Sequence, residues 1–184
     1  MHRSSLVVVA ALGLFLGIVS LGTQARSDGG KAPTLGELVG KYSYVGTREK
    51  DEAEIKAKSD AATAGMSRME RKRAVPRLES STRIPARVTI SQQNGNVVFQ
   101  MDDYIVTVPE NGTAATVTTP LGESANASFD TKTATLLQSV VKTGGQKTNA
   151  FRFDEAGQLT MHVRVTNSKL AGPVVFTLRY ARAK

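Results

Sequence analysis

The sequence predicts an all-β fold, an antiparallel up-and-down β-barrel of about eight to ten strands with a helical insert between the first two. Three observations support this prediction. From residue 83 onward, apolar and polar residues alternate in short runs. Turn signals such as Asn94-Gly95 and Gly144-Gly145 separate the runs at regular intervals. Residues 48–75 instead have the composition of a helix. One domain, residues 35–184, would contain all of these elements.

An export signal precedes this domain. A basic start is followed by an apolar run, Leu6–Gly22, and then by Thr23-Gln24-Ala25, with small residues where a signal peptidase cleaves. We therefore expect a signal peptide over residues 1–25 and a flexible leader over residues 26–34. The protein would then be exported, to a periplasm or out of the cell. The alternative is an uncleaved anchor that keeps it at a membrane, although the run is at the short end for a span.

Residues 35–47 are expected to form the first strand. Leu38, Tyr42 and Tyr44 fall on one face by period-two alternation. Gly40 lies on the same face, where a strand can bend or admit a neighbouring backbone. This strand would lead directly into the helical insert.

The helical insert is predicted over residues 48–75. Alanine recurs at three- and four-residue steps, and Glu54 and Lys58 form a favourable i,i+4 pair. We expect Gly65 to divide the insert into two helices and Pro76 to end it. Its apolar face is narrow, so the insert is interpreted either as a mobile lid over the barrel or as a plain surface helix.

Nine further strands are expected after the insert, each bounded by a turn signal. The residue types favour strands because β-branched and aromatic side chains alternate with polar ones. The expected strands are 83–92, 97–101, 104–108, 113–119, 125–130, 134–142, 149–153, 159–165 and 174–180. Each expected strand has one apolar face, which favours closure of the sheet into a barrel. A barrel of about ten strands has more interior space than side chains easily fill, so a ligand cavity is plausible.

Composition excludes several functions. The 184-residue chain has no cysteine, which removes disulfides, thiol catalysis and thiolate metal sites. His162 is the only histidine beyond the signal segment, and it is expected on an outward face. No nucleophile motif, metal-ligand spacing or phosphate loop is present. We therefore expect a protein that is not an enzyme and that needs neither a metal nor another cofactor.

The net charge is +8, and much of the excess lies in one segment. Five basic residues gather near the end of the insert: Arg68, Arg71, Lys72, Arg73 and Arg77. For an exported protein, such a segment favours anionic lipid or an acidic protein as the partner, and nucleic acid is not expected. The alternative is a solvated basic helix face without a partner.

The layout resembles the calycins, the group of lipocalins and fatty-acid-binding proteins. Gly40-Lys41-Tyr42 stands where lipocalins have Gly-x-Trp, with Tyr in place of Trp. The insert follows the first strand, as in fatty-acid-binding proteins, and the last strand ends in Arg and Tyr. The resemblance implies a barrel that binds a small apolar molecule. In fatty-acid-binding proteins an Arg and a Tyr on one face hold a carboxylate. Here the pair on one face is Tyr180 and Arg182.

The predicted function is therefore that of an exported carrier for an apolar or amphipathic small molecule held inside the barrel. The candidate ligand-binding side chains share the inward face or the insert. They are Tyr42, Tyr44, Met66, Met69, Val88, Phe99, Met101, Phe151, Phe153, Met161, Val163, Phe176, Tyr180 and Arg182. Plain core packing is the alternative for each. The alternative function is surface docking through the basic helix.

Overall fold

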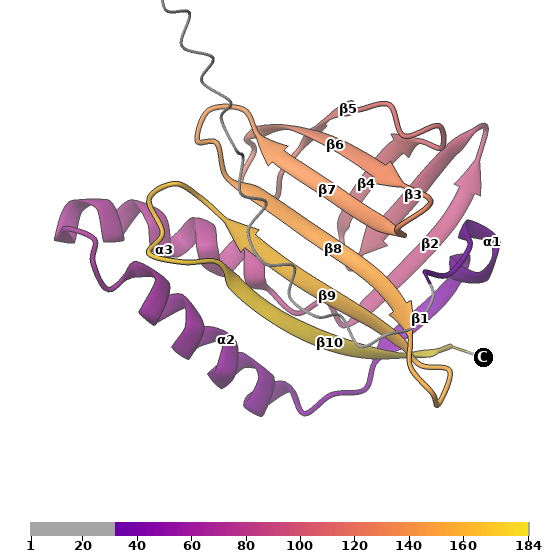
Figure 1. Cartoon of the computed structure of the whole chain (residues 1–184), viewed down its shortest axis with the longest axis horizontal. Coiled ribbons are helices and arrows are strands. Elements are labelled where there is room, and N and C mark those ends of the chain that lie inside the picture. The colour runs from indigo at the N-terminus through magenta and orange to yellow at the C-terminus, as the bar shows by residue number, and fades with distance from the viewer. Residues whose placement is uncertain (1–31, 184) are drawn as a thin grey trace, which may run out of the picture.

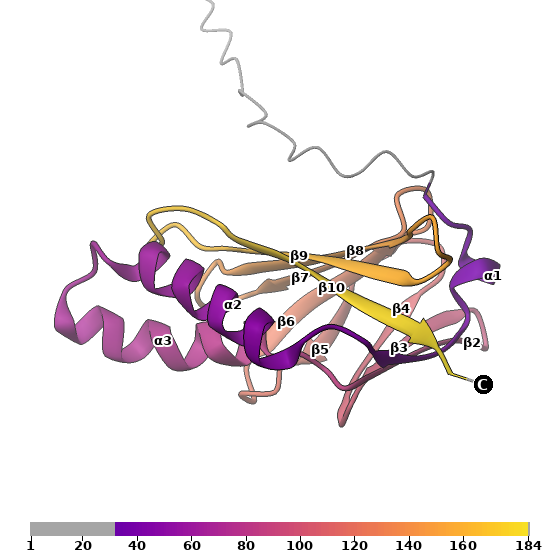
Figure 2. The ribbon, with the colours of Figure 1, turned by 90° about the horizontal axis from the view of Figure 1, so that it is seen from below.

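The computed structural model describes residues 32–183 (Figures 1 and 2). The predicted signal peptide and residues 26–31 of the leader lie outside the described residues. The helices are α1 (Leu35–Leu38), α2 (Arg48–Thr63) and α3 (Arg68–Thr82). The strands are β1 (Gly40–Tyr44), β2 (Arg87–Gln93), β3 (Asn96–Met101), β4 (Tyr104–Pro109), β5 (Ala115–Thr118), β6 (Ser124–Asp130), β7 (Thr135–Val140), β8 (Gln146–Phe153), β9 (Leu159–Thr166) and β10 (Val174–Arg182).

The ten strands of the described chain form one antiparallel sheet in the order β4-β3-β2-β1-β10-β9-β8-β7-β6-β5. Apart from the β1–β10 pair, all the pairs join strands that are consecutive in the sequence, and β4 and β5 are the consecutive strands that do not pair with each other. The sheet curls into a nearly closed barrel, with β4 and β5 at its two edges. The predicted fold class is confirmed, including the helical insert between β1 and β2. Figure 2 shows α2 and α3 together at one end of the barrel and α1 at the other.

The predicted first strand is wrong at its beginning. Residues Leu35–Leu38 form α1, and only Gly40–Tyr44 is a strand. A capping box starts α1: Glu37 N donates to Thr34 Oγ1 at 3.4 Å, and Thr34 N donates to the Glu37 carboxylate at 2.7 Å. These reciprocal bonds satisfy amides that a helix start leaves open. Leu35 and Leu38, three residues apart, are both buried by this turn.

The insert consists of two helices, as predicted, because α2 ends just before Gly65. The prediction that Pro76 ends the insert is wrong, since α3 continues through Pro76 to Thr82. Proline removes one backbone hydrogen bond from a helix, but its backbone angle is helical. Beyond it, Leu78 and Thr82 are buried, and the Thr82 hydroxyl donates to the Leu78 carbonyl at 2.8 Å. These contacts hold the last turns in place.

The strand that follows α3 begins later than predicted. Strand β2 begins at Arg87, whereas the sequence predicted residue 83. Ile84 and Pro85 are buried in the connection. The Asp102 carboxylate accepts hydrogen bonds from Ala86 N at 3.1 Å and Arg87 N at 3.0 Å. This side chain fixes where pairing with β3 begins.

An aromatic cluster fills the middle of the barrel. The Phe99 ring lies 5.1 Å from the Phe129 ring and 5.5 Å from the Phe151 ring, measured between centroids. All three are fully buried. At the α1 end, the Tyr42 hydroxyl donates to the Leu38 carbonyl at 2.8 Å. Open space is therefore left toward the opposite end, beneath α3. None of the helices among residues 32–183 is long and apolar enough to cross a bilayer.

Candidate functional site

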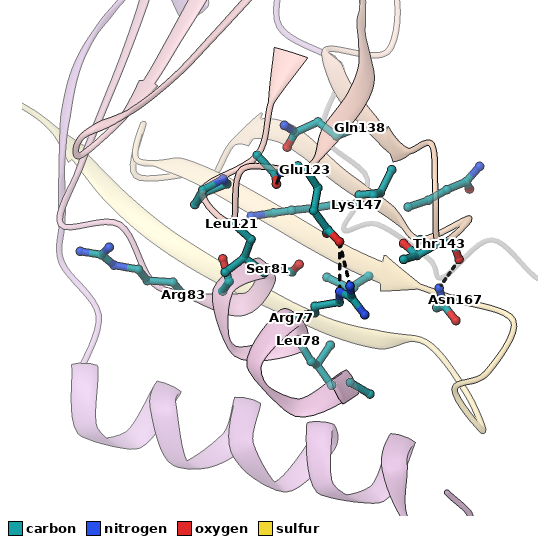
Figure 3. A pocket seen from close by; sticks show the side chains of 18 of the residues that line it. Arg77, Leu78, Ser81, Arg83, Leu121, Glu123, Gln138, Thr143, Lys147 and Asn167 are labelled. Carbon is teal, nitrogen blue, oxygen red and sulfur yellow. Dashed lines mark hydrogen bonds and ion pairs between the residues drawn. The ribbon is translucent and has the colours of Figure 1, made fainter. Parts of the chain in front are cut away.

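A cavity of about 750 Å³ lies between α3 and the nearby ends of the strands (Figure 3). One wall is α3 itself. The remaining lining comes from the β3–β4, β5–β6, β7–β8 and β9–β10 connections. In an antiparallel meander every second connection falls at the same end of the sheet, so these four meet around one opening. Helix α3 covers that opening.

Three of the predicted ligand-binding residues, all methionines from different parts of the chain, line the cavity, and their contact with a ligand stays a prediction. Met66 lies in the link between α2 and α3, Met69 is in the first turn of α3, and Met101 ends β3. Met69 is 65% exposed, so it lies at the mouth. Leu78 and Leu121 add further apolar surface. Methionine adapts to ligands of varied shape, which suits a cavity wall.

The other predicted ligand-binding residues do not line this cavity. They extend along the rest of the barrel's inward face, which is longer than the cavity. These residues are Tyr42, Tyr44, Val88, Phe99, Phe151, Phe153, Met161, Val163, Phe176, Tyr180 and Arg182. All are buried or partly buried except Arg182, which is exposed. Their contact with a ligand stays a prediction.

Tyr180 and Arg182, the suggested carboxylate pair, are engaged within the chain. The Tyr180 hydroxyl donates to the Pro85 carbonyl at 3.2 Å, and burial raises the pKa of this phenol. Arg182 donates to the Glu37 carbonyl at 2.7 Å and to the Tyr42 hydroxyl at 3.0 Å. Its guanidinium also lies 5.4 Å from the Tyr42 ring centroid. These contacts stabilise the α1 end of the barrel.

The predicted partner-binding residues divide into two groups. Arg73 and Arg77 line the cavity, whereas Arg68, Arg71 and Lys72 are not part of its lining. Arg77 Nη2 lies 2.9 Å from Glu123 Oε1, an ion pair that joins α3 to the β5–β6 turn (Figure 3).

Arg71 instead pairs with Asp60 of α2 at 3.4 Å. Two of the five basic side chains are therefore already paired within the chain. Arg73 and Arg77, which the sequence assigned to a basic docking surface, instead line the cavity.

A group of polar side chains inside the barrel was not predicted. Gln138 on β7 is opposite Lys147 on β8 in the sheet, and both line the cavity. Gln138 Nε2 donates to the Tyr104 hydroxyl at 2.7 Å. Asn149 follows Lys147 on the same face of β8. The predicted strand began only at Asn149, but the alternation that placed Phe151 inward also places Asn149 and Lys147 inward.

Lys147 and Asn149 both lack partners among the described residues. The Lys147 side chain makes no hydrogen bond or ion pair there, and desolvation lowers the pKa of its ammonium to about 8. Asn149 is 0% exposed, and neither its Nδ2 nor its Oδ1 has a hydrogen-bond partner. Buried polar groups are nearly always paired, so the fully buried Asn149 amide requires an explanation. Lys147 is partly exposed, and its ammonium lacks a counter-charge among the described residues.

Within residues 32–183, no three His, Asp or Glu side chains come together as a metal site would require. The acidic side chains Glu123 and Glu70 at the cavity are engaged in an ion pair with Arg77 and in the capping box of α3, respectively. The site therefore offers apolar surface, hydrogen-bond donors and positive charge.

Comparison with known proteins supports the fold. No protein-family model matches the chain, and no curated protein matches it in sequence. Among solved structures, the chain is similar to lipid binding protein 8 of Caenorhabditis elegans, with a TM-score of 0.52 and 12% identity. The similarity covers 82% of this chain and 98% of that protein. The predicted resemblance to the calycins is confirmed at the level of the fold.

Proposed function

We propose that this protein is an exported carrier that binds a small apolar or amphipathic molecule in the cavity beneath α3, without a catalytic step. The cavity carries the proposal, because about 750 Å³ is within the usual size of ligand sites. Met66, Met69, Met101 and Leu121 supply a deformable apolar lining. The similar solved structure is named as a lipid-binding protein, which is consistent with this use of the fold.

Movement of α3 would widen the opening of the cavity. Only Leu78 and Thr82 of this helix are buried, both near its C-terminal end. Its N-terminal half is held by one exposed ion pair, Arg71–Asp60, whereas the Arg77–Glu123 pair lies in its C-terminal half. Exposed ion pairs contribute about 0–1 kcal/mol each. The first turns of α3 can therefore separate from the strands at low cost while the last turns stay attached.

Export is the second part of the proposal, and the sequence of residues 1–25 supports it. We expect the mature protein to begin at Arg26. Intact mass of the protein recovered from the medium or periplasm checks this. Recovery of the full-length chain from membranes would contradict cleavage and support the anchored alternative.

Binding is tested first with a neutral apolar probe, N-phenyl-1-naphthylamine, whose fluorescence rises in apolar surroundings. We expect saturable binding of one probe per protein. Ala74→Trp should weaken it by at least about tenfold, since Ala74 lines the cavity and the indole would occupy it. Ala53→Trp is the matched control, because Ala53 is exposed on α2.

Solvent extraction of the purified protein, followed by mass spectrometry, tests for a bound natural ligand. A stoichiometric apolar molecule in the extract supports the proposal. Absence of probe binding together with an empty extract overturns it.

Docking of the basic helix on an acidic protein or an anionic membrane has less support. Arg71 and Arg77 are paired within the chain, and Arg73 faces the cavity. Of the five predicted partner-binding residues, Arg68 and Lys72 are the two that are exposed, outside the cavity lining and without an ion pair to another described residue.

A further inference from the structure

We propose that Lys147 captures apolar aldehydes in the cavity beneath α3, as a Schiff base between its amine and the aldehyde carbon. The inference rests on the proposed function and goes beyond it, because it adds a covalent bond and specifies the reactive group of the ligand. The bond is reversible, so the protein remains a carrier and performs no turnover.

Lys147 is the one lysine of the described chain that is not exposed. The other eight of the nine lysines within residues 32–183 are exposed. Across the sheet, Lys147 has Gln138 on β7 and Val165 on β9 as neighbours, and all three line the cavity. Figure 3 shows the Lys147 side chain extending from β8 into the cavity. The fold therefore presents this amine to whatever occupies the cavity.

None of the described acidic side chains that line the cavity pairs with Lys147. Glu123 is bound in the ion pair that joins α3 to the β5–β6 turn, and Glu70 closes the capping box of α3. Asp102 accepts hydrogen bonds from two backbone amides at the start of β2. Asp103 is exposed. The ammonium form of Lys147 thus has no counter-charge to stabilise it.

The lack of a counter-charge favours the uncharged amine, which is the reactive form of lysine. Desolvation lowers the pKa of the Lys147 ammonium to about 8. Only the uncharged amine has the lone pair that attacks a carbonyl carbon, and desolvated lysines are the ones that form Schiff bases in proteins. Lys147 should therefore react in preference to Lys142 and Lys169, the two exposed lysines of the same cavity.

The covalent step balances without an oxidant, a reductant or a further reactant. The amine nitrogen adds to the aldehyde carbon, and one amine proton moves to the carbonyl oxygen to give a carbinolamine. The hydroxyl group then leaves as water with the second amine proton, and a carbon–nitrogen double bond remains. Addition of one water reverses the step and releases the aldehyde.

Gln138 and Tyr104 provide polar groups for the oxygen of the carbinolamine. Gln138 is directly opposite Lys147 and is 6% exposed. Its Nε2 donates to the Tyr104 hydroxyl at 2.7 Å, so the phenol proton is left for donation to a ligand oxygen. Burial raises the pKa of Tyr104, which keeps this proton on the phenol. A proton donor at this wall assists departure of the hydroxyl group as water.

The rest of the lining determines which aldehydes enter. Met66, Met101 and Leu121 offer apolar surface beneath α3. An aldehyde with an alkyl chain gains from burying that chain in proportion to its area. A short aldehyde has little area to bury, so it should not be concentrated beside Lys147.

The experiment incubates the purified protein with decanal and sodium cyanoborohydride, which reduces a Schiff base to a stable secondary amine. Mass spectrometry of the intact protein and of its peptides then counts and locates the adducts. We expect one decyl adduct per protein, with labelling of Lys147 at least about tenfold above that of Lys142 or Lys169. Propanal, which lacks the apolar chain, should show no such preference.

Lys147→Arg is the test variant, because it keeps a positive charge on β8 but removes the amine. It should lose the decyl adduct while retaining binding of N-phenyl-1-naphthylamine. Lys132→Met is the matched control, because Lys132 is exposed in the β6–β7 turn and is not part of the cavity lining. This variant should form the Lys147 adduct as the wild type does.

Comparable labelling of Lys147, Lys142 and Lys169 by decanal overturns this inference, as does unchanged total labelling in Lys147→Arg. Absence of the adduct from a wild-type protein that binds N-phenyl-1-naphthylamine overturns this inference alone. Failure of the wild type both to bind the probe and to form the adduct overturns the proposed function as well.

Discussion

Lys147 and Asn149 are the residues at which this protein departs most from an ordinary barrel core. Both lie on the inward face of β8, and neither has a described partner. Their neighbours along and across the strands, Phe151 and Val163, are apolar and buried. Apolar side chains at positions 147 and 149 would give a more stable core. The cost of these two polar groups is therefore expected to be visible in the stability of the ligand-free protein.

The pH dependence of stability tests this cost. Because burial lowers the pKa of Lys147 from 10.5 to about 8, the unfolded chain binds more protons than the folded one between these pH values. The free energy of unfolding contributed by this group should therefore rise with pH above about 8 and be flat below it. Lys147→Met should remove that rise. Thermal unfolding midpoints at pH 7.5 and 9.5 compare the two proteins.

Other ionisable groups around the cavity are common to both proteins, so the difference between them isolates Lys147. The charged side chains of the lining are Glu70, Arg73, Arg77, Arg83, Asp102, Asp103, Glu123, Lys142 and Lys169. Burial raises the pKa of Tyr104, which keeps this cavity phenol protonated over the tested range. An identical pH dependence in wild type and Lys147→Met would show that the lysine is not desolvated.

At the scale of elements, α3 combines the features of a cover that can open. A capping box, Ser67 with Glu70, starts the helix, and Leu78 and Thr82 anchor its end. Between them, Pro76 removes one intrahelical hydrogen bond. The N-terminal half thus depends on its cap and on one exposed ion pair, Arg71–Asp60. The sequence predicted the break at Gly65 but not the continuation past Pro76, because that continuation depends on where Leu78 is buried.

Removing the cap tests this description of α3. Ser67→Ala should destabilise the start of the helix by about 1 kcal/mol, since the amides of its first turn lose their acceptor. Amide hydrogen exchange should accelerate over residues 68–75 and stay unchanged in β8 and β9. Thr34→Ala, which breaks the capping box of α1 at the other end, is the control and should leave α3 unaffected. Uniform acceleration across the barrel would contradict an independently opening cover.

At the scale of the whole molecule, the barrel divides along its length into a filled part and an open part. The cluster of Phe99, Phe129 and Phe151 fills the middle, and α1 with Tyr42 packs at one end. The cavity occupies the end beneath α3. The same sheet runs through both parts. The close packing around the phenylalanine cluster therefore also stabilises the strands that surround the cavity.

Truncation of the aromatic cluster should therefore weaken the whole barrel. Phe99→Ala is expected to lower the free energy of unfolding by about 3–5 kcal/mol, the range for a buried phenylalanine. Urea unfolding followed by far-ultraviolet circular dichroism measures the change. Ile105→Ala is the control, since Ile105 on β4 is 55% exposed, and it should cost much less. Comparable losses in the two variants would show that the cluster is not the centre of the core.

The sequence by itself determined the fold class, the ten strands and the insert between β1 and β2. Period-two alternation and turn chemistry are local properties, so they are readable without knowing which strands meet. The same local rules gave a wrong start to the first strand and a wrong end to α3. Residues 35–38 fit a strand as well as a helix by their pattern, and the capping box of α1 decides for the helix. Residues 76–82 fit a loop as well as a helix, and the burial of Leu78 and Thr82 decides for the helix.

The tertiary structure alone decided which inward residues face a cavity. Alternation assigned Phe99, Met101 and Phe151 to the same interior, but only Met101 lines the open space. It also placed Gln138 and Lys147, which are opposite each other on β7 and β8, together in the cavity lining beneath α3. A cavity is the volume left between elements distant in the sequence, and its position depends on how strand register and helix placement combine. No single segment contains that information.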